Sequence, residues 1–398
     1  MLVALIMGFS CGLPLLLTMG VLQAWMKEEG IDLTLIGLIA LVQIPYTWKF
    51  LWAPFLDRYT LPFLGRRRGW LLIAQVALIF SIAGLGFTDP KENIWTMVAA
   101  AILVAFFSAT QDTVVDAYRR EDLSDEELGL GSSLYIYGYR MGTLLASGGG
   151  LIMADYMSWS MVYLMMSACL LPGILTTLFA PEPKVTAETP KTIKEAVLNP
   201  LVEYFSRSGA LWILAFILLY KIGDTMASAI TIPFYIDIGF SKTEIGTVVK
   251  IFGTWAIIGG ALLGGVIMVR LGINRSLWIF GFFQAISTAC FAILAHMGHS
   301  ITVLSMVIAF ENISSGMGTA AFVAFMASIT NKKFTATQYA LLTSIMAFPR
   351  VLASAPTGFL DKHMGWEVFF ITCALIAIPG LLLLVKIAPW HSKETAAV

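Results

Sequence analysis

The 398-residue sequence has little charge and little cysteine. Only 13% of its residues are charged, against about a quarter in soluble globular proteins, and its 25 basic and 25 acidic side chains cancel. This balance excludes a nucleic-acid-binding protein, which needs a net basic surface. A Walker-type phosphate loop is also missing, which excludes an ATP-driven pump. The four cysteines lie in apolar stretches and predict packing residues rather than disulfides. We expect no enzymatic activity, no cofactor and no metal site.

Apolar residues, by contrast, make up 58% of the chain and fall into long runs. A helix needs about 20 apolar residues to cross a bilayer, and runs of that length without strand-like alternation indicate an all-helical membrane protein. The sequence predicts twelve transmembrane helices, at 2–26, 33–56, 70–88, 94–117, 131–154, 159–180, 210–236, 243–269, 276–296, 301–329, 336–360 and 366–387. The first run has no basic lead-in and no small-residue cleavage site, so we expect a retained helix rather than a signal peptide.

The basic residues predict the orientation of these helices. Sixteen lysines and arginines lie in the C-terminal tail or in loops after even-numbered spans, whereas four lie in loops after odd-numbered spans. Because basic loops stay on the cytoplasmic side, both termini are expected in the cytoplasm.

The chain divides into two halves that resemble each other. Its longest loop opens with Pro181-Glu182-Pro183 and carries apolar residues every fourth position from Ile193 to Phe205. This pattern predicts an amphipathic helix on the inner leaflet, with a plain linker as the alternative. The string 30–37 recurs at 239–246, and Arg140 has a counterpart in Arg350. Repeats at nearly one offset are typical of the parallel six-plus-six repeat of major facilitator transporters. We therefore expect an N-terminal bundle at 1–180, a cytoplasmic linker at 181–209, a C-terminal bundle at 210–387 and a tail at 388–398.

Several ionisable residues lie deep within the predicted spans. Such side chains cost about 2.5–3.5 kcal/mol in a membrane, so they persist where they line a cavity or have a partner. Arginine stays charged and suits the binding of a carboxylate, whereas closely spaced acids suit a proton carrier. The candidates for proton coupling are Asp112, Asp116, Asp224 and Glu311, and the cationic candidates for substrate binding are Lys49, Arg140, Lys221 and Arg350.

Two of these positions have alternatives. Asp116 lies near the predicted cytoplasmic loops, where it could pair with the arginines at 66–68 instead of carrying a proton. Lys221 and Asp224 are three residues apart, so they could pair within one helix.

Aromatic residues adjoin these charges, and a short loop contains a basic cluster. Trp48, Tyr137, Tyr139 and Tyr220 could stack on a sugar ring, with core packing as the alternative for each. The loop after the second span places an acid before a glycine-bounded basic run. A carboxylate at a helix end with nearby guanidiniums can clamp helix termini in one conformation and release them in another. The gating candidates are Asp57, Arg58, Arg66, Arg67 and Arg68, with simple membrane anchoring as the alternative.

Strings along the whole chain resemble the AmpG family of bacterial muropeptide permeases. They include residues 12–14, 22–26, 50–54, 57–59, 65–70, 108–112, 116–117, 139–140, 180–183, 219–224, 311–312, 316–322 and 336–338. One of them adds Gln111, beside Asp112, to the substrate-binding candidates.

The resemblance implies import of N-acetylglucosaminyl-1,6-anhydro-N-acetylmuramic acid and its peptides, driven by protons, across the bacterial inner membrane. It also implies a role in peptidoglycan recycling and, in some bacteria, in the induction of β-lactamase. The expected partners of this monomer are an anionic glycopeptide, protons and membrane lipid. The alternatives are a carrier of another anionic solute, such as an acyl-coenzyme A ester, a peptide or a siderophore, and a receptor that binds cell-wall fragments without transporting them.

Overall fold

The computed structural model describes residues 1–31, 39–183, 192–207, 209–241, 244–332, 334–352, 357 and 364–390. In this part of the chain, eight helical stretches are long and apolar enough to cross a membrane. They are Leu2–Glu28, Gly65–Gly86, Ile94–Asp122, Trp159–Phe179, Ala210–Asp237, Ile245–Met297, Ile301–Ser328 and Trp366–Ile387.

The eighth and ninth predicted spans lie within one of these stretches, and the second, fifth and eleventh correspond to shorter helical segments. Ile245–Met297 contains two spans, because Gly272 has a non-helical backbone with φ 76° at the reversal between them. Three interrupted or shorter helical segments lie at 39–58, 128–154 and 335–352. Each of the twelve predicted spans therefore has a helical counterpart in the described residues. The third span begins at Gly65, five residues before the expected start, and the fourth continues to Asp122, five residues past its expected end.

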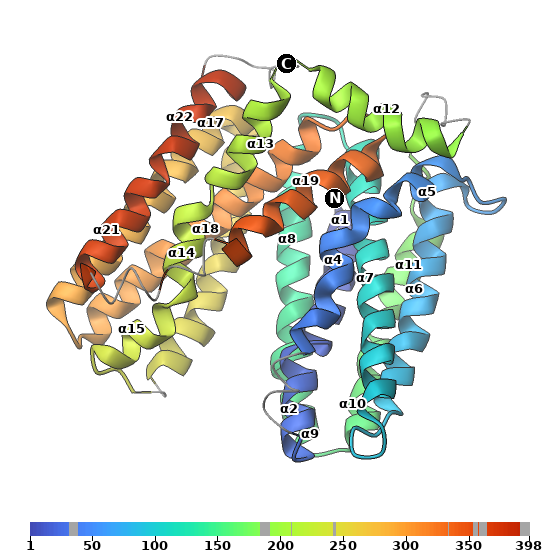
Figure 1. Ribbon diagram of the computed structural model, residues 1–398, viewed down its shortest axis with the longest axis horizontal. Coiled ribbons are helices and arrows are strands. Elements are labelled where there is room, and N and C mark those ends of the chain that lie inside the picture. Colours follow the sequence, from blue (N-terminus) through green and yellow to red (C-terminus); the bar gives the residue numbers. More distant parts are fainter. Residues whose placement is uncertain are drawn as a thin grey trace. The chain divides into compact units, whose positions relative to one another are not determined.

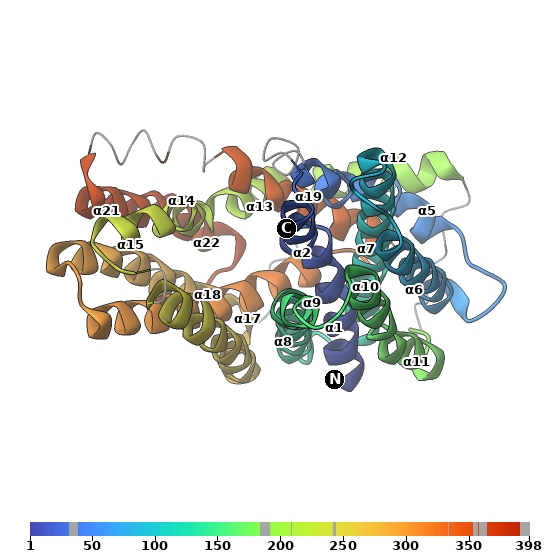
Figure 2. The ribbon, with the colours of Figure 1, turned by 90° about the horizontal axis from the view of Figure 1, so that it is seen from below.

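The chain forms two compact units (Figures 1 and 2). The first comprises Met1–Ser124, Leu134–Leu201 and Thr330–Ser344, and the second comprises Asp125–Ser133, Val202–Ile329 and Ile345–Val398. The stretch 125–133, from the first half of the chain, thus belongs to the second unit. The stretch 330–344, from the second half, belongs to the first unit.

The first unit is built from short and long helices around an apolar core. Its elements are α1 (Leu2–Leu17), α2 (Gly20–Glu28), η1 (Ile39–Gln43), α4 (Ile44–Trp48), η2 (Lys49–Leu51), α5 (Ala53–Arg58), α6 (Gly65–Gly86), α7 (Ile94–Asp122), most of α8 (Leu128–Leu144), η3 (Leu145–Gly149), α9 (Gly150–Ala154), α10 (Trp159–Ala168) and α11 (Leu171–Phe179). Helix α6 packs against α7 and α10, and α1 packs against α7 and α11. The first ten residues of α19 (Thr335–Leu352) also belong to this unit.

The second unit has an aromatic core. Its elements are α13 (Ala210–Leu219), α14 (Ile222–Ala229), α15 (Thr231–Asp237), η4 (Ile245–Phe252), α17 (Gly253–Met297), α18 (Ile301–Ser328), the end of α19, α21 (Trp366–Ile376) and α22 (Ile378–Ile387). Phe234 lies against Phe370 and Trp366 with ring centroids 4.8 and 5.1 Å apart, and Phe291 stacks on Phe370 at 5.0 Å. Helix α17 packs along α18 and α21.

Helix α12 (Ile193–Ser206) lies in the linker, where the sequence pattern predicts an amphipathic helix. It exposes Val197, Leu198, Val202 and Phe205, whereas Tyr204 is buried. Its apolar exposed residues are compatible with a position at a membrane surface, which stays a prediction.

Glycines let α1 and α8 approach each other closely (Figure 2). A Cβ on Gly12 would lie 2.0 Å from the carbonyl oxygen of Tyr139, and one on Gly138 would lie 2.0 Å from that of Leu5. Gly8 and Gly142 face the other helix in the same way. Small residues four apart on both helices are the usual means of close packing in membranes.

Replacing Gly12 with alanine should therefore destabilise the protein by about 1–3 kcal/mol, the usual cost of overpacking. The measurement is the thermal unfolding midpoint in detergent. Gly84→Ala is the matched control, because a Cβ on Gly84 meets nothing within 4 Å. Equal midpoints for the two variants would contradict the close approach of α1 and α8.

Candidate functional site

The loop between α5 and α6 turns sharply and sets the basic run in the first turn of α6. Leu64 and Gly65 both have positive φ, 60° and 86°, at this reversal. A side chain on Gly65 would also meet the carboxylate of Glu182, at 2.7 Å from a new Cβ. Glycine is thus required at this position both by conformation and by space.

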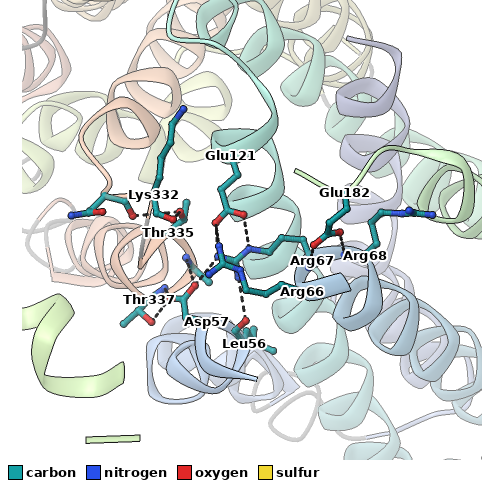
Figure 3. A network of polar contacts seen from close by, with 12 residues as sticks. Leu56, Asp57, Arg66, Arg67, Arg68, Glu121, Glu182, Lys332, Thr335 and Thr337 are labelled. Atoms are coloured by element: carbon teal, nitrogen blue, oxygen red, sulfur yellow. Dashed lines mark hydrogen bonds and ion pairs between the residues drawn. The ribbon is translucent and has the colours of Figure 1, made fainter. Parts of the chain in front are cut away.

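Arg67 lies at the centre of a buried arginine network, which we define as Asp57, Arg66, Arg67, Arg68, Glu121 and Glu182 (Figure 3). Its guanidinium donates to Asp57 Oδ1 at 2.7 Å and to Glu121 Oε2 at 3.0 Å. Arg66 also pairs with Glu121, at 3.0 Å. Arg67, Asp57 and Glu121 all have nearly fully buried side chains. Two carboxylates thus balance the two guanidiniums of Arg66 and Arg67, as buried ions require.

Both oxygens of Asp57 also bind the start of α19 (Figure 3). Its carboxylate accepts from the backbone N–H of Ala336 at 3.2 Å and of Thr337 at 2.8 Å, and from the Thr337 hydroxyl at 2.6 Å. The first N–H groups of a helix have no partner within the helix, and its N-terminus attracts negative charge. Asp57 therefore joins α5 to α19 through charge-assisted hydrogen bonds.

Glu182 accepts hydrogen bonds from backbone N–H groups at the start of α6, as Asp57 does at the start of α19. It accepts from the backbone N–H of Arg67 at 2.7 Å and of Arg68 at 3.0 Å. The Arg68 side chain in turn donates to the carbonyls of Thr177 and Leu178 at the end of α11. The start of the linker is thereby tied to two helix ends. The guanidinium of Arg58 lies 5.1 Å from the ring of Tyr59.

A second buried polar group lies on α7. Asp112 and Asp116 are both buried, and so is Lys49, which acts electrostatically on both carboxylates. Asp116 pairs with Arg119 at 3.1 Å. The alternative, in which Asp116 pairs with the arginines at 66–68, is wrong, because Arg66 and Arg67 bind Glu121 and Asp57. Gln111 is fully buried and donates to the Ser10 carbonyl at 2.9 Å, which ties α7 to α1.

The candidate acids of the second unit gather with Lys221 in a polar group that we call the Lys221 cluster. Lys221 Nζ lies 2.5 Å from the Thr319 hydroxyl and 3.9 Å from Asp224 Oδ2. Glu311 accepts from the Ser287 hydroxyl at 2.5 Å and interacts electrostatically with Asp224. The expected pairing of Lys221 with Asp224 is present, although it is long, and Lys221 occupies the break between α13 and α14.

The remaining candidates have varied surroundings. Tyr220 is buried, donates to the Leu277 carbonyl at 2.9 Å and stacks on Phe322, which is the packing role left open for the aromatic residues. Trp48 is 54% exposed, whereas Tyr137, Tyr139 and Arg140 are half-buried on α8. Arg350 lies in α19, but its side chain is outside the described residues.

Sequence reasoning missed several residues that complete these groups. The search for charges in mid-span did not include the buried partners Glu121, Arg119 and Tyr339 or the half-buried Glu182. Arg119 and Glu121 could have been found if the fourth span had been extended, because α7 continues to Asp122 rather than ending near 117. A longer helix places Asp112, Asp116 and Arg119 on one face, at spacings of four and three residues.

Comparisons with known proteins agree with this architecture. The model of the Major Facilitator Superfamily matches residues 1–354. The chain is 45% identical to the anhydromuropeptide permease of Escherichia coli K12 over 96% of its own length and 78% of that protein. It is 31% identical to the putative transporter AmpG 4 of Rickettsia conorii over 95% of its own length and 94% of that protein.

The chain belongs to the AmpG family of the Major Facilitator Superfamily. The resemblance and the fold class expected from the sequence are thereby confirmed, and the protein is a membrane transporter. A solved proton:xylose symporter, XylE, has the same fold, with a TM-score of 0.73 over 100% of this chain and 96% of that one at 14% identity.

Replacing Asp57 with asparagine should weaken the contacts of the arginine network with α19. We expect a loss of about 1.5–3 kcal/mol in stability, the range for hydrogen bonds to a charged group, measured as a lower thermal midpoint. Asp89→Asn is the control, because Asp89 is exposed and accepts from the nearby backbone N–H of Lys91. An unchanged midpoint for Asp57→Asn would show that the cap on α19 adds little stability.

Proposed function

We propose that this transporter imports anhydro-muropeptides, the disaccharide N-acetylglucosaminyl-1,6-anhydro-N-acetylmuramic acid with or without its peptide, together with protons. The observation that carries the proposal is the 45% identity to the anhydromuropeptide permease of E. coli over nearly the whole chain. The transported compounds would enter from the periplasm, and both termini would lie in the cytoplasm. The protein would act as a monomer in the bacterial inner membrane. It would serve peptidoglycan recycling.

The buried charges supply what such a substrate needs. Muropeptides carry carboxylates, and Lys49, Arg140, Lys221 and Arg350 are the cations within the spans that would bind them. Arginine is suited to this role because its guanidinium stays charged and binds carboxylates through two donors. Trp48, Tyr137 and Tyr139 offer ring faces for the sugars, whereas the buried Tyr220 supports the Lys221 cluster from within the core.

The Lys221 cluster provides a means of coupling substrate to protons. Lys221 Nζ lies 3.9 Å from Asp224 Oδ2 and 2.5 Å from the Thr319 hydroxyl. An incoming substrate carboxylate would compete with Asp224 for the ammonium of Lys221. Asp224 and Glu311, which are left close together, would then share a proton, because two adjacent buried carboxylates do not both ionise readily. Asp112 and Asp116 would carry protons in the first unit.

The arginine network is suited to gating. Asp57 binds the start of α19 through backbone donors and a hydroxyl, and these bonds can break without leaving an unpaired cation, because Arg67 retains Glu121. In the proposed orientation this network lies at the cytoplasmic end. It would close that end when α19 is docked and open it when α19 leaves.

Coupling can be tested with purified protein in proteoliposomes. Asp224→Asn should reduce the gradient-driven accumulation of labelled anhydro-disaccharide by about ten-fold or more, because the amide cannot take up a proton from Glu311. Asp237→Asn is the matched control, since Asp237 is exposed at the end of α15. Full accumulation by Asp224→Asn would remove this residue from the proton pathway, and accumulation that survives collapse of the gradient would refute proton coupling itself.

The substrate class can be tested by replacing Lys221, the cation of the same cluster. Lys221→Gln should raise the KM for anhydro-disaccharide-peptide by about ten-fold, which corresponds to 1.4 kcal/mol. Lys91→Gln, in an exposed loop where Lys91 pairs with Glu29, should leave the KM unchanged. Unlabelled muropeptide should compete for uptake, whereas an acyl-coenzyme A ester should not. Competition by the ester alone would favour the other anionic solute, and binding without turnover would favour a receptor.

A further inference from the structure

One face of α7 carries four buried polar residues, Ser108, Asp112, Asp116 and Arg119. Their spacings of four, four and three residues place them in a row along the helix, directed into the first unit. Sequence reasoning assigned roles to the two acids but none to the arginine. A buried guanidinium beside an acid pair is too costly to be incidental, so its contacts are informative.

The guanidinium of Arg119 links the acid pair to α19. One nitrogen, Nη2, donates both to Asp116 Oδ1 at 3.1 Å and to the Tyr339 hydroxyl at 3.0 Å. The Tyr135 ring lies against the guanidinium, with its centroid 4.3 Å from the central carbon. Nε and Nη1 of Arg119 have no hydrogen-bond partner among the described residues. The side chain is therefore held on one side and can form other hydrogen bonds if it is released.

Tyr339 follows the two residues whose backbone N–H groups bind Asp57, three positions after Ala336 and two after Thr337. Ala336 and Thr337 donate to Asp57, and Tyr339 accepts from Arg119, all within the first five residues of α19. The start of this helix is thus attached to the first unit at two points, the arginine network and the acid pair of α7. Because a short helical segment moves as one body, the two attachments should form and break together.

A small cavity lies beside the guanidinium. A cavity of about 10 Å³ is lined by Arg119, Tyr118, Asp122 and Tyr135, among others. This volume is close to that needed for one water molecule. It adjoins the C-terminal end of α7.

We propose that Arg119 and Tyr339 are positioning residues that couple the docking of α19 to proton release from the Asp112–Asp116 pair. While α19 is docked, Tyr339 holds Arg119 on Asp116 Oδ1, and this oxygen is not available to a proton from Asp112. When α19 leaves, the hydroxyl leaves with it, and Arg119 loses the contact that holds it on Asp116. Asp116 then accepts the proton from Asp112 and passes it to water, so the number of protons is conserved. This inference rests on the proton symport proposed above.

Other groups also face this acid pair and act on it. They are Cys11 from α1, Tyr46 from α4, Lys49 from η2, Tyr135 from α8 and Tyr339 from α19. Tyr339 differs from the others because it is the one on the helix that Asp57 binds.

The test uses Tyr339→Phe, which removes the hydroxyl and keeps the ring. Two assays are compared in proteoliposomes with labelled anhydro-disaccharide. The first is accumulation driven by a proton gradient across a series of pH values. The second is exchange counterflow without a gradient, which requires binding and reorientation of the carrier but no net proton movement. We expect accumulation to fall at least three-fold and its pH dependence to flatten, while counterflow stays within two-fold of the parent protein.

Two further variants separate coupling from a structural role. Tyr163→Phe is the matched control, because Tyr163 is a buried tyrosine of the same unit whose hydroxyl donates to the Leu17 carbonyl at 2.7 Å. It should leave the ratio of accumulation to counterflow unchanged. In the Asp116→Asn background, adding Tyr339→Phe should cause no further loss, because both changes act on one step.

Either of two results would overturn the inference. If Tyr339→Phe accumulates substrate like the parent with the same pH profile, the hydroxyl has no part in coupling. If accumulation and counterflow fall equally, Tyr339 is a structural anchor. In both cases the proposed function stands as long as the parent is gradient-driven. A parent that accumulates substrate without a gradient would overturn both proposals.

Discussion

The cost of a charge away from water is the constraint on which this structure depends. An ion in a membrane-spanning bundle requires a partner within the same bundle. Arg67 therefore lies between two carboxylates, Arg119 lies against Asp116, and Lys221 faces Asp224 and a hydroxyl. These partners fix how the helices that carry them can pack. A conformational change that separates them must provide another partner, such as a substrate carboxylate, a proton or a helix terminus.

Helix termini serve as such partners in the first unit. Asp57 and Glu182 both bind backbone N–H groups at the start of a helix, α19 and α6 respectively. A helix start is a weaker and more diffuse positive site than a guanidinium. Its loss leaves N–H groups that water can satisfy, whereas the loss of a guanidinium partner would strand an ion. Contacts of this kind are suited to repeated breaking, and the arginine network keeps its guanidiniums on the α6 side paired with Glu121.

The sequence predicted the all-helical fold, because long apolar runs follow from the cost of burying polar groups in lipid. It could not predict how distant segments meet. Asp57 and Thr337 are 280 residues apart, and Arg119 and Tyr339 are 220 apart. The roles of Glu121 and Arg119 were missed because a helix end was placed at 117, five residues before α7 ends. Tyr220 could not be separated from a ligand-stacking residue by sequence, since both roles need an aromatic ring beside charge.

The buried arginine pairs of the first unit and the Lys221 cluster hold their charges in different ways, and the difference suggests different tasks. The first unit uses arginines in hydrogen-bonded contacts of about 3 Å to carboxylates, with geometry set by planar donors. In the Lys221 cluster of the second unit, the ammonium lies 3.9 Å from Asp224 Oδ2 and 2.5 Å from the Thr319 hydroxyl. A lysine that faces both a carboxylate and a hydroxyl suits recognition of an incoming anion. Tightly held arginine pairs change only when a whole helix moves, so they suit a response to conformation. Coupling would then require that the same motion reach both groups, and α19 has its first ten residues in the first unit and its end in the second.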